Sequence, residues 1–311
     1  MDFFLFRKYF VMKKIARSKG IEVLEEPKRV IIRKGNRQII LSREQGLFGF
    51  DVIPMFDNYM KDYLPEKNNG FLEIDFSQPK KHFLNFLNAS LWIPSWTEGS
   101  WPLKGYLEKY MPQEGDIVFD CGAFCGITTF ALSKLVGKTG KVYAFEPDDL
   151  NYELLVKNIE ENNLRNVIAV KKGIWSHKDT FLFANSGGAG SALAQNAKGD
   201  PLQESQFNNK DGEYKNVNLI EVISIQDACR LFSISNPNFV KMDIEGAEIE
   251  AISGVREFLR DKNVHFAIAS YHKVNNIPTC QTLEKMFAEI GYQFETGNPQ
   301  HQTTWAWKGG L

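Results

Sequence analysis

The chain has 311 residues, of which 43% are hydrophobic and 24% are charged, a composition typical of globular proteins with one large core or one domain and an appendage. Its 37 Lys and Arg residues and 38 Asp and Glu residues give a net charge of -1. The sequence therefore lacks the positive field of a nucleic-acid-binding protein, and we expect no nucleic-acid partner. Four cysteines are too few for a disulfide framework and indicate a reducing, cytoplasmic location.

The N-terminus, MDFFLFRKYFVMKKIARSKG, combines aromatic and aliphatic side chains with Lys and Arg. Its apolar part is too short and too often interrupted by charge for a signal peptide, and no apolar run in the chain reaches the length of a membrane span. Residues 1–17 therefore predict an amphipathic helix, which could contact a membrane surface peripherally. Packing on the rest of the protein, or on the second copy in a homodimer, is the alternative that its mixed apolar face favours.

The front of the chain predicts a small α+β region. Residues 28–42 predict a β-hairpin, because two β-branched runs flank a Lys-Gly-Asn turn. A short amphipathic helix is expected over residues 51–63, and the aromatic-rich residues 71–101 then lead into the next domain. We therefore expect an α+β region with its connector over residues 1–95 and a larger domain over residues 96–311.

From residue 117 onward, short apolar strands alternate with segments of helical length. The predicted strands cover residues 117–120, 141–146, 166–172, 238–244 and 264–271, and the predicted helices cover residues 126–136, 148–162, 247–260 and 277–290. This alternation predicts an α/β domain in which helices cover both faces of a parallel sheet. The last two apolar runs, YQFET and TTWAWK, lie too close together for a crossover helix, so we expect an antiparallel hairpin there.

A polar segment rich in Gly, Asn and Ser interrupts the alternation at residues 185–216. Loops of this length inside a compact domain usually either carry function or have no fixed structure. Two interpretations stay open for this segment, a lid on the substrate side and a surface insertion.

The stretch DIVFDCGAFCGITTF, residues 116–130, predicts a strand, a tight turn and the start of a helix. Gly122 and Gly126 would let a ligand approach the backbone closely, and the helix N-terminus offers free N–H groups with a positive dipole. Asp120 adds a fixed negative charge beside them, which would repel a phosphate. A ligand with hydroxyls, or with an ammonium or sulfonium cation, is therefore favoured.

Ligands of parallel sheets bind outside the carboxyl ends of the strands, so the residues that follow the strands are the candidates for the chemistry. These residues fall in the ranges 120–126, 146, 173–176, 243–248 and 270–272. Glu146 could accept both hydroxyls of a ribose, as acidic residues of dinucleotide enzymes do. However, the turn reads Asp-x-Gly-x-x-x-Gly and not Gly-x-Gly-x-x-Gly, which favours a nucleoside with an amino-acid tail over a nicotinamide dinucleotide.

The motifs VFDCGAFCGITTF, AFEP and VKMDIEGAE, in this order, resemble those of the S-adenosylmethionine-dependent methyltransferases of the FkbM type, over about residues 96–311. The resemblance implies a Rossmann-like, seven-stranded, mostly parallel sheet with a C-terminal antiparallel hairpin. It also implies S-adenosylmethionine as the cofactor and O-methylation of a small molecule or glycan, such as a sugar or a polyketide. A nicotinamide-dependent oxidoreductase and a non-catalytic binding protein that retains the fold are the alternatives.

The resemblance further implies cofactor contacts at three strand ends. The methionine part of the cofactor would lie along the turn after the first strand, the ribose at the end of the second strand, and the adenine after the third. The residues carried over, in that order, are Asp120, Gly122, Ala123, Phe124 and Gly126 for the turn, Glu146, Pro147 and Asp148 for the ribose side, and Gly173, Ile174 and Trp175 for the adenine.

Methyl transfer from a sulfonium requires that the acceptor hydroxyl be aligned and that its proton be removed. We expect Asp243 to orient the hydroxyl or the ammonium group of the cofactor, with either His272 or Glu245 as the base. Helix capping is the alternative for Glu245 and Glu248, and a structural role is the alternative for His272. Asp243, Glu245 and His272 could also bind a divalent metal, but the sequence does not establish that they converge, and we assign no metal from it.

Overall fold

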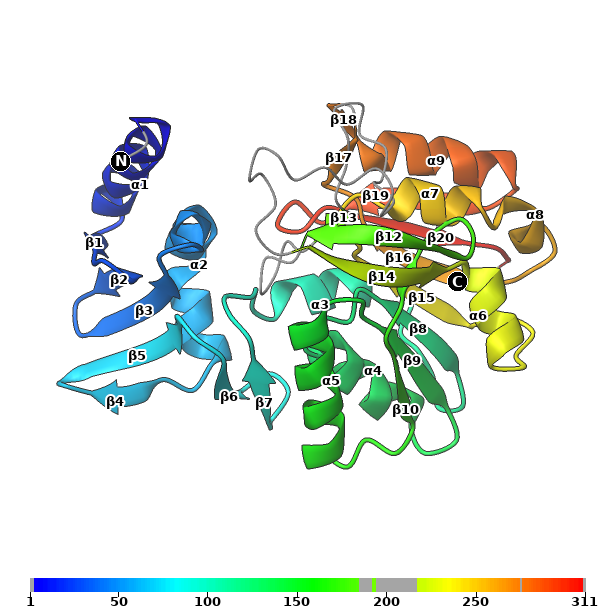
Figure 1. Cartoon of the computed structure of the whole chain (residues 1–311), viewed down its shortest axis with the longest axis horizontal. Helices are drawn as coiled ribbons and strands as arrows, with labels where there is room; N and C mark the ends of the chain where they lie inside the picture. The colour runs from blue at the N-terminus through cyan, green and yellow to red at the C-terminus, as the bar shows by residue number, and fades with distance from the viewer. Residues whose placement is uncertain (1–2, 185–191, 194–216, 275, 310–311) are drawn as a thin grey trace. The chain divides into compact units, whose positions relative to one another are not determined.

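The computed structural model describes residues 3–184, 192–193, 217–274 and 276–309, and the chain divides into two units, Met1–Ser100 and Trp101–Leu311 (Figure 1). The sequence placed this boundary slightly earlier, between residues 95 and 96. In the described part of the chain, no helix is long and apolar enough to cross a membrane. Residues 185–191 and 194–216, for which a lid or a surface insertion was expected, lie outside the described residues.

A five-stranded sheet forms the centre of the first unit (Figure 1). In spatial order its strands are β1 (Glu22–Glu25), β2 (Arg29–Lys34), β3 (Arg37–Ser42), β5 (Phe71–Phe76) and β4 (Glu66–Asn68). Strands β2 and β3 pair antiparallel, so the hairpin predicted over residues 28–42 is confirmed. The remaining elements are the 3-10 turn η1 (Gly46–Phe48), helix α2 (Gly49–Asp62) and the hairpin of β6 (Lys80–Leu84) and β7 (Ala89–Ile93).

Helix α1 (Phe3–Ser18) packs one face on the first unit. Tyr9, Met12 and Ala16 are buried, as expected for residues three to four positions apart on one side of a helix. Phe10, the most exposed of these apolar residues at 65%, lies with Val11 and Ile15 on the outer side, among Lys and Arg residues. The structure thus shows packing on its own unit, and contact of the outer face with a membrane or a second copy stays a prediction.

Aromatic side chains fill much of the core of the first unit. Trp96 stacks on Phe48 with ring centroids 4.1 Å apart, and Phe76 meets the edge of Tyr63 at 5.3 Å. Large aromatic rings bury about 150–250 Å² each, so a few of them suffice to stabilise a small sheet. These members of the aromatic-rich stretch therefore have a packing role within their own unit.

A seven-stranded mixed sheet forms the centre of the second unit (Figure 1). In spatial order its strands are β10 (Val167–Val170), β9 (Lys141–Phe145), β8 (Ile117–Cys121), β15 (Phe239–Met242), β16 (His265–Ala269), β20 (Thr303–Trp307) and β19 (Gln293–Gly297). The first five are parallel, whereas β20 pairs antiparallel with both β16 and β19. The second unit is thus an α/β domain built on a parallel sheet with an antiparallel pair at one edge.

Helices cover both faces of this sheet (Figure 1). The helices are α3 (Trp101–Tyr106), α4 (Ile127–Val136), α5 (Asp149–Glu161), α6 (Ile225–Leu231), α7 (Glu248–Ser253), α8 (Arg256–Leu259) and α9 (Thr279–Glu289). Phe119, Cys121 and Met242 pack in one hydrophobic cluster with α6, α7, α8 and α9. Because side chains alternate along a strand, Asp120 points to the opposite face, where its carboxylate meets Thr129 of α4.

A smaller sheet lies beside the carboxyl edge of β10. Its strands, in spatial order, are β11 (Gly173–Ile174), β14 (Val217–Ile223), β12 (Asp179–Ala184) and β13 (Ala192–Leu193). It has its own cluster of buried residues, Trp175, Phe181, Phe183, Ile220 and Val222. The two-stranded pair β17 (Lys273–Val274) and β18 (Ile277–Pro278) precedes α9.

Local contacts end one strand and divide one predicted helix. Strand β14 ends at Ile223, because Ser224 and Asp227 form a capping box that starts α6. The helix predicted over residues 247–260 is divided into α7 and α8 near Gly254, where a Cβ atom would lie 2.1 Å from the carbonyl oxygen of Ser176. Both differences come from local hydrogen bonding or close backbone packing that a hydrophobic pattern does not report.

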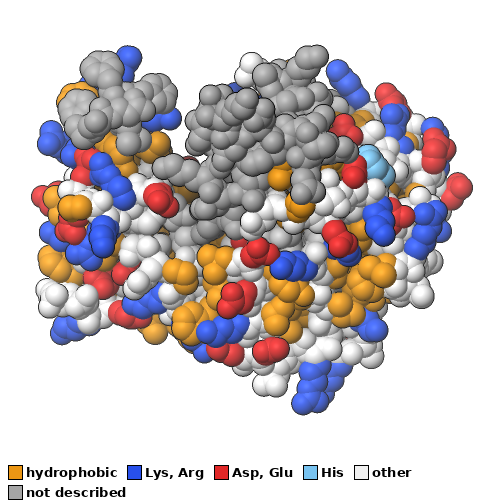
Figure 2. Space-filling model, in the orientation of Figure 1, with side chains coloured by type: hydrophobic (Ala, Val, Ile, Leu, Met, Phe, Trp, Pro, Cys, Tyr) orange, Lys and Arg blue, Asp and Glu red, His pale blue; other side chains and the backbone are white. Residues whose placement is uncertain are grey.

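Positively and negatively charged side chains alternate over the surface, and the described residues form no large patch of one sign on the face drawn in Figure 2. On the face shown in Figure 2, Lys and Arg are interspersed with Asp and Glu, in keeping with the net charge of -1. Some form ion pairs, such as Lys34 with Asp57 at 2.6 Å in the first unit and Lys171 with Asp149 at 2.7 Å in the second. Exposed pairs of this kind contribute about 0–1 kcal/mol each, so the hydrophobic cores and buried polar contacts determine the stability.

Gly122 joins the first and fourth parallel strands of the chain at their carboxyl ends. Its φ angle is +75°, and a Cβ atom at this position would lie 1.8 Å from the carbonyl oxygen of Asp243. Only a glycine lets the turn after β8 rest directly on the end of β15.

We predict that Gly122→Ala destabilises the second unit much more than Gly291→Ala does. Gly291 has a similar φ of +77°, and a Cβ atom there would meet no other atom within 4 Å. The loss of unfolding free energy in Gly291→Ala therefore measures only the cost of a side chain in the left-handed region, about 1–2 kcal/mol. Gly122→Ala adds a backbone clash, which we expect to cost about 1–3 kcal/mol more. Urea unfolding of both variants measures the difference, and equal losses would contradict the close approach.

Candidate active site

The carboxyl ends of three neighbouring strands are tied together by backbone hydrogen bonds. The N–H groups of Gly122 and Ala123 donate to the carbonyl oxygen of Phe145 at 3.0 and 2.9 Å, and the N–H of Asp243 donates to Cys121 at 3.0 Å. The turn after β8 therefore lies against the end of β9, where Glu146 follows, and against the end of β15, where Asp243 follows. This edge brings together the turn, Glu146 and Asp243, as the sequence predicted.

Glu146 is buried and holds the turn by its carboxylate. Its Oε2 accepts a hydrogen bond from the N–H of Phe124 at 2.8 Å, and its Oε1 accepts one from the N–H of Asp148 at 2.9 Å. Burial raises the pKa of Glu146 to about 7, although these two N–H donors act in the opposite direction. A carboxylate at this place would gain from further hydrogen-bond donors, such as hydroxyls.

The turn itself has an unusual backbone. Phe124 has a φ of +53°, which is uncommon for a residue with a side chain, and Gly126 at the N-cap of α4 has a φ of +93°. A Cβ atom on Gly126 would lie 2.8 Å from Leu155 Cδ1, so the backbone passes close to α5 here. The positive φ angles and the bond from Phe124 to Glu146 fix the turn in one conformation.

Asp120 is placed differently from the expectation that it contacts the cofactor. Its side chain has no exposed surface, and its oxygens meet Lys241 Nζ at 3.1 Å and the hydroxyl of Thr129 at 2.6 Å. The carboxylate thus forms a buried ion pair on the face covered by α4, and not a contact with the solvent at the carboxyl edge. The sequence pattern located the turn correctly but could not show which way this side chain points.

Lys241 is a functional candidate that the sequence analysis missed. It is 4% exposed, and besides Asp120 its ammonium group donates to the carbonyl oxygen of Gly122 at 2.7 Å. Burial alone would lower the pKa of Lys241, but the carboxylates of Asp120 and Asp243 raise it above its usual value, so it is charged. The signal in the sequence was a lysine between two apolar residues in a strand buried on both faces, which is rarely found without a charged partner.

The other expected cofactor residues follow β9 and β10, and two of them have side chains engaged within the protein. Pro147 lies near Gly173, since a Cβ atom on Gly173 would be 3.9 Å from Pro147 Cβ, and Ile174 continues into β11. Asp148 was expected beside the ribose, but its carboxylate caps α5 by accepting from the N–H of Asn151 at 3.0 Å. Trp175 was expected over the adenine, but it is 8% exposed and its ring packs on Phe181 in the core of the smaller sheet.

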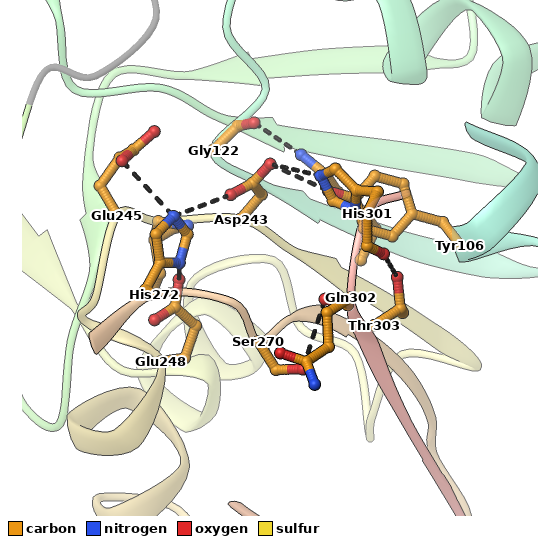
Figure 3. A network of polar contacts seen from close by, with 12 residues as sticks. Tyr106, Gly122, Asp243, Glu245, Glu248, Ser270, His272, His301, Gln302 and Thr303 are labelled. Carbon is orange, nitrogen blue, oxygen red and sulfur yellow. Dashed lines mark hydrogen bonds and ion pairs between the residues drawn. The ribbon is translucent and has the colours of Figure 1, made fainter. Parts of the chain in front are cut away.

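The three expected catalytic residues converge at the end of β15 and β16 (Figure 3). His272 Nε2 lies 3.8 Å from Asp243 Oδ1 and 3.4 Å from Glu245 Oε2, and His272 Nδ1 lies 3.1 Å from Glu248 Oε1. Glu245 is the most exposed, with 36% of its side chain accessible, and its backbone has a φ of +56°. Glu248 is fully buried and accepts hydrogen bonds from the N–H groups of Ile244 and Gly246.

Glu248 is the first residue of α7 and has two roles. Its carboxylate closes the turn before the helix by accepting from the N–H groups of Ile244 and Gly246, and it also lies 3.1 Å from one ring nitrogen of His272. The N-cap of α7 is Ala247, which has no side-chain cap, so Glu248 does not cap the helix as the alternative supposed. The other ring nitrogen is left facing Asp243 and Glu245 (Figure 3). His265, in contrast, lies at the start of β16 and stacks on Tyr110 with ring centroids 3.9 Å apart, so it is not part of this cluster.

Two further members of the cluster, Tyr106 and His301, were not predicted. The hydroxyl of Tyr106 donates to Asp243 Oδ2 at 2.9 Å, and His301 Nε2 lies 3.3 Å from that hydroxyl and 3.8 Å from Asp243 Oδ2 (Figure 3). Tyr106 ends α3, and His301 precedes the antiparallel strand β20. The rule that function follows the ends of parallel strands does not reach such elements.

Charge in the cluster is arranged by burial and by neighbouring ions. Burial would raise the pKa of Asp243, but Lys241 and His272 outweigh it and lower that pKa, so Asp243 is ionised. Burial would lower the pKa of His272, but Glu245, Glu248 and Asp243 raise it to about 11. His301 has a lowered pKa, chiefly because it is buried, and is therefore neutral at pH 7.

Residues 120–300 match the family model described as the methyltransferase FkbM domain. The matched residues make up more than half of the chain. The chain belongs to the FkbM methyltransferase family. The resemblance rested on three motifs. VFDCGAFCGITTF covers the end of β8 and the turn after it, AFEP covers the end of β9, and VKMDIEGAE covers the end of β15 and the turn after it. The family thus agrees with the sequence analysis, and its motifs form the carboxyl edge described above.

Several solved structures are similar to this chain. The FkbM methyltransferase of Methylobacillus flagellatus KT is 15% identical, with 97% of this chain and 59% of that chain covered and a TM-score of 0.47. The S-adenosylmethionine-dependent O-methyltransferase of Thermotoga maritima is 16% identical, with 63% and 60% covered and a TM-score of 0.38. Aeropyrum pernix fibrillarin, in complex with S-adenosylmethionine, is 12% identical, with 92% and 99% covered and a TM-score of 0.39. This chain spans less than two thirds of the length of the Methylobacillus protein.

The buried pair of Lys241 and Asp120 gives a prediction for stability. Lys241→Met or Asp120→Asn alone should each lower the free energy of unfolding by about 3–5 kcal/mol, because each leaves a buried charge without its partner. The double variant should lose clearly less than the sum of the two, since it buries no unpaired charge. Urea unfolding of all four proteins measures the coupling, and strictly additive losses would show that the pair is not an interacting unit.

Proposed function

We propose that the protein is an S-adenosylmethionine-dependent methyltransferase that transfers a methyl group to a hydroxyl of a small molecule or glycan. Membership of the FkbM methyltransferase family supports methyl transfer. The observation that carries the proposal further is the direct contact between the turn and Asp243 at Gly122, which places a candidate cofactor site beside a cluster of acidic and basic side chains. A transfer reaction needs the methyl donor and the acceptor held next to each other in this way.

The cofactor would lie along the carboxyl edge of β8, β9 and β10. Glu146 would accept the ribose hydroxyls, and Pro147, Gly173 and Ile174 would line the side where the adenine follows, which the short distance between Pro147 and Gly173 supports. The methionine part would run over Gly122, Ala123 and Phe124 toward Asp243. Asp120 and Asp148 would act through the turn and through α5, because their carboxylates are already engaged there.

The acceptor would meet the methyl group at the cluster of Asp243, Glu245 and His272. The acceptor oxygen attacks the methyl carbon in line with the sulfur, the O–C bond forms, the C–S bond breaks, and the thioether leaves as S-adenosylhomocysteine. The hydroxyl proton needs a base within hydrogen-bond reach. Glu245 is the base we propose, because its side chain is the most exposed of the cluster. Asp243, fixed by Tyr106, would orient the hydroxyl.

S-adenosylmethionine binding should depend on pH through Glu146. The ligand-free protein keeps this carboxyl protonated below about pH 7, so its contribution to the unfolding free energy is complete below about pH 4.5 and is lost as the pH rises through 7. Ribose hydroxyls favour the ionised form, so binding at about pH 6 should release a proton, and the affinity should rise toward pH 7 and then level off. Calorimetry in two buffers of different ionisation enthalpy measures the released proton.

Glu146→Gln is the matched control for this measurement, because the amide keeps the shape of the side chain and has no proton to release. It should bind more weakly and show a much smaller dependence on pH. An intact chain that binds no S-adenosylmethionine would refute the proposed function. Binding of NADH instead would favour the oxidoreductase that the sequence left as an alternative.

Glu245→Gln should abolish most of the methyl transfer without weakening the binding of S-adenosylmethionine. We expect transfer of labelled methyl from S-adenosylmethionine to the small molecules and glycans of a cell extract to fall about 10²-fold or more, since the amide cannot accept the proton. The affinity for the cofactor should stay within about twofold, because Glu245 lies outside the cofactor path.

Glu250→Gln, an exposed carboxylate on α7 outside the cluster, is the control and should transfer methyl at the normal rate. Normal transfer by Glu245→Gln would remove Glu245 as the base. If no variant and no wild-type protein labels any acceptor while the cofactor binds, the non-catalytic alternative gains support.

A further inference from the structure

Three side chains of different type bring their donor atoms together at the candidate acceptor site. One carboxylate oxygen each of Asp243 and Glu245 and one ring nitrogen of His272 all lie within 4.8 Å of one another. His272 Nε2 is 3.4 Å from Glu245 and 3.8 Å from Asp243 (Figure 3). We propose that these three residues bind a divalent cation that in turn holds the acceptor by its oxygens, an inference that rests on the proposed function.

The distances suit a metal ion after small side-chain rotations. With metal–ligand bonds of about 2.1 Å, neighbouring ligand atoms are about 3.0–3.4 Å apart in octahedral or tetrahedral geometry. The distance of 3.4 Å from His272 to Glu245 is already in this range, and the distance of 3.8 Å from His272 to Asp243 has to close by less than about 1 Å. The oxygens of Asp243 and Glu245 lie within 4.8 Å of each other and have to close by less than about 2 Å. Glu245 is exposed enough to rotate, and it comes from a turn next to Asp243 on the chain.

Glu248 supplies the support that a metal-binding histidine needs. It is fully buried, it is held by the N–H groups of Ile244 and Gly246, and its Oε1 lies 3.1 Å from His272 Nδ1. Nearly all metal-bound histidines donate their other ring N–H to a carboxylate, a backbone carbonyl or a water, which fixes the tautomer and aims the free nitrogen at the metal. Here the nitrogen aimed by Glu248 is Nε2, which is the one that faces Asp243 and Glu245.

Several buried polar atoms of the cluster have no hydrogen bond to any described residue. They are Asp243 Oδ1, Glu248 Oε2 and both ring nitrogens of His272. Asp243 Oδ1 and the two nitrogens lie at ion-pair distances from their neighbours. Buried polar atoms are normally hydrogen-bonded, so this cluster is unlike a closed network of salt bridges. A cation between them would satisfy Asp243 Oδ1 and His272 Nε2 together, while Asp243 Oδ2 keeps its bond from Tyr106.

The ligand set indicates the class of metal and of acceptor. Two carboxylates with one imidazole suit Mn²⁺, Fe²⁺ or Zn²⁺ better than Ca²⁺ or Mg²⁺, which prefer oxygen ligands alone. Three protein ligands leave positions free, so an acceptor with two adjacent oxygens, such as a vicinal diol, could bind through both. A metal held there would lower the pKa of the bound hydroxyl, and the second oxygen of Glu245 would take its proton as the O–C bond forms and the C–S bond breaks.

Mn²⁺ titration of the chelator-treated full chain, followed by electron paramagnetic resonance and calorimetry, tests the site. We expect one Mn²⁺ per chain, no tight binding in His272→Gln or Asp243→Asn, and an affinity about 10–100-fold weaker in Glu248→Gln, which only positions the histidine. Zn²⁺ should compete with Mn²⁺, whereas Ca²⁺ should not. His177→Gln and Glu250→Gln, which change an exposed histidine and an exposed carboxylate outside the cluster, are the matched controls and should bind as the wild type does.

The acceptor class is tested with 4-nitrocatechol, whose absorption changes when both of its oxygens bind a metal. A change that requires Mn²⁺ and is lost in His272→Gln supports the inference. Absence of stoichiometric Mn²⁺ and Zn²⁺ binding up to about 1 mM, in a chain that still binds S-adenosylmethionine, overturns the metal site and leaves the proposed function standing. Metal binding in a chain that never binds S-adenosylmethionine overturns the proposed function instead. Thermal unfolding of each variant confirms that it is folded.

Discussion

The buried ammonium group of Lys241 is the interaction on which the rest of the site depends. An ion in a protein interior is stable only when its charge and its hydrogen-bonding groups are satisfied, and Lys241 finds both in Asp120 and in the carbonyl oxygen of Gly122. These contacts hold β15 in register with β8 and hold the turn against the end of β15. Because the turn also bonds to Phe145, the ends of three strands are fixed by one buried charge.

The carboxyl edge of the sheet therefore has two parts with different chemical groups. On one side, the N–H groups of the turn are already bonded to Phe145 and Glu146, which leaves a closely packed backbone beside a buried carboxylate. On the other side, Asp243, Glu245 and His272 bring charged groups together. Gly122 stands where the two halves meet, since no side chain separates it from Asp243. A methyl group, which carries no charge of its own to steer it, depends on such a short and rigid connection for its alignment.

The sequence predicted the alternating elements of the second unit and most of its edge, because buried parallel strands and the residues after them leave a local pattern. The sequence did not predict the roles of residues whose contacts depend on the direction of the side chain. Asp120 and Trp175 lie at the expected positions but point into cores, and a spacing does not show this. Asp148 is followed by a helix, so its capping role could have been read from the sequence. Tyr106 and His301 come from elements outside the strand-end rule, and only the folded chain reveals that they reach Asp243.

The backbone of Glu245 has a further consequence for the chain as a whole. A residue with a side chain in the left-handed region is less stable there than glycine by about 1 kcal/mol, and nothing in the local turn except its carboxylate favours glutamate. The fold by itself would prefer glycine at this position. Glycine would relieve the backbone but would remove the carboxylate that lies 3.4 Å from His272 Nε2, so this turn keeps a strained residue together with its ion pair.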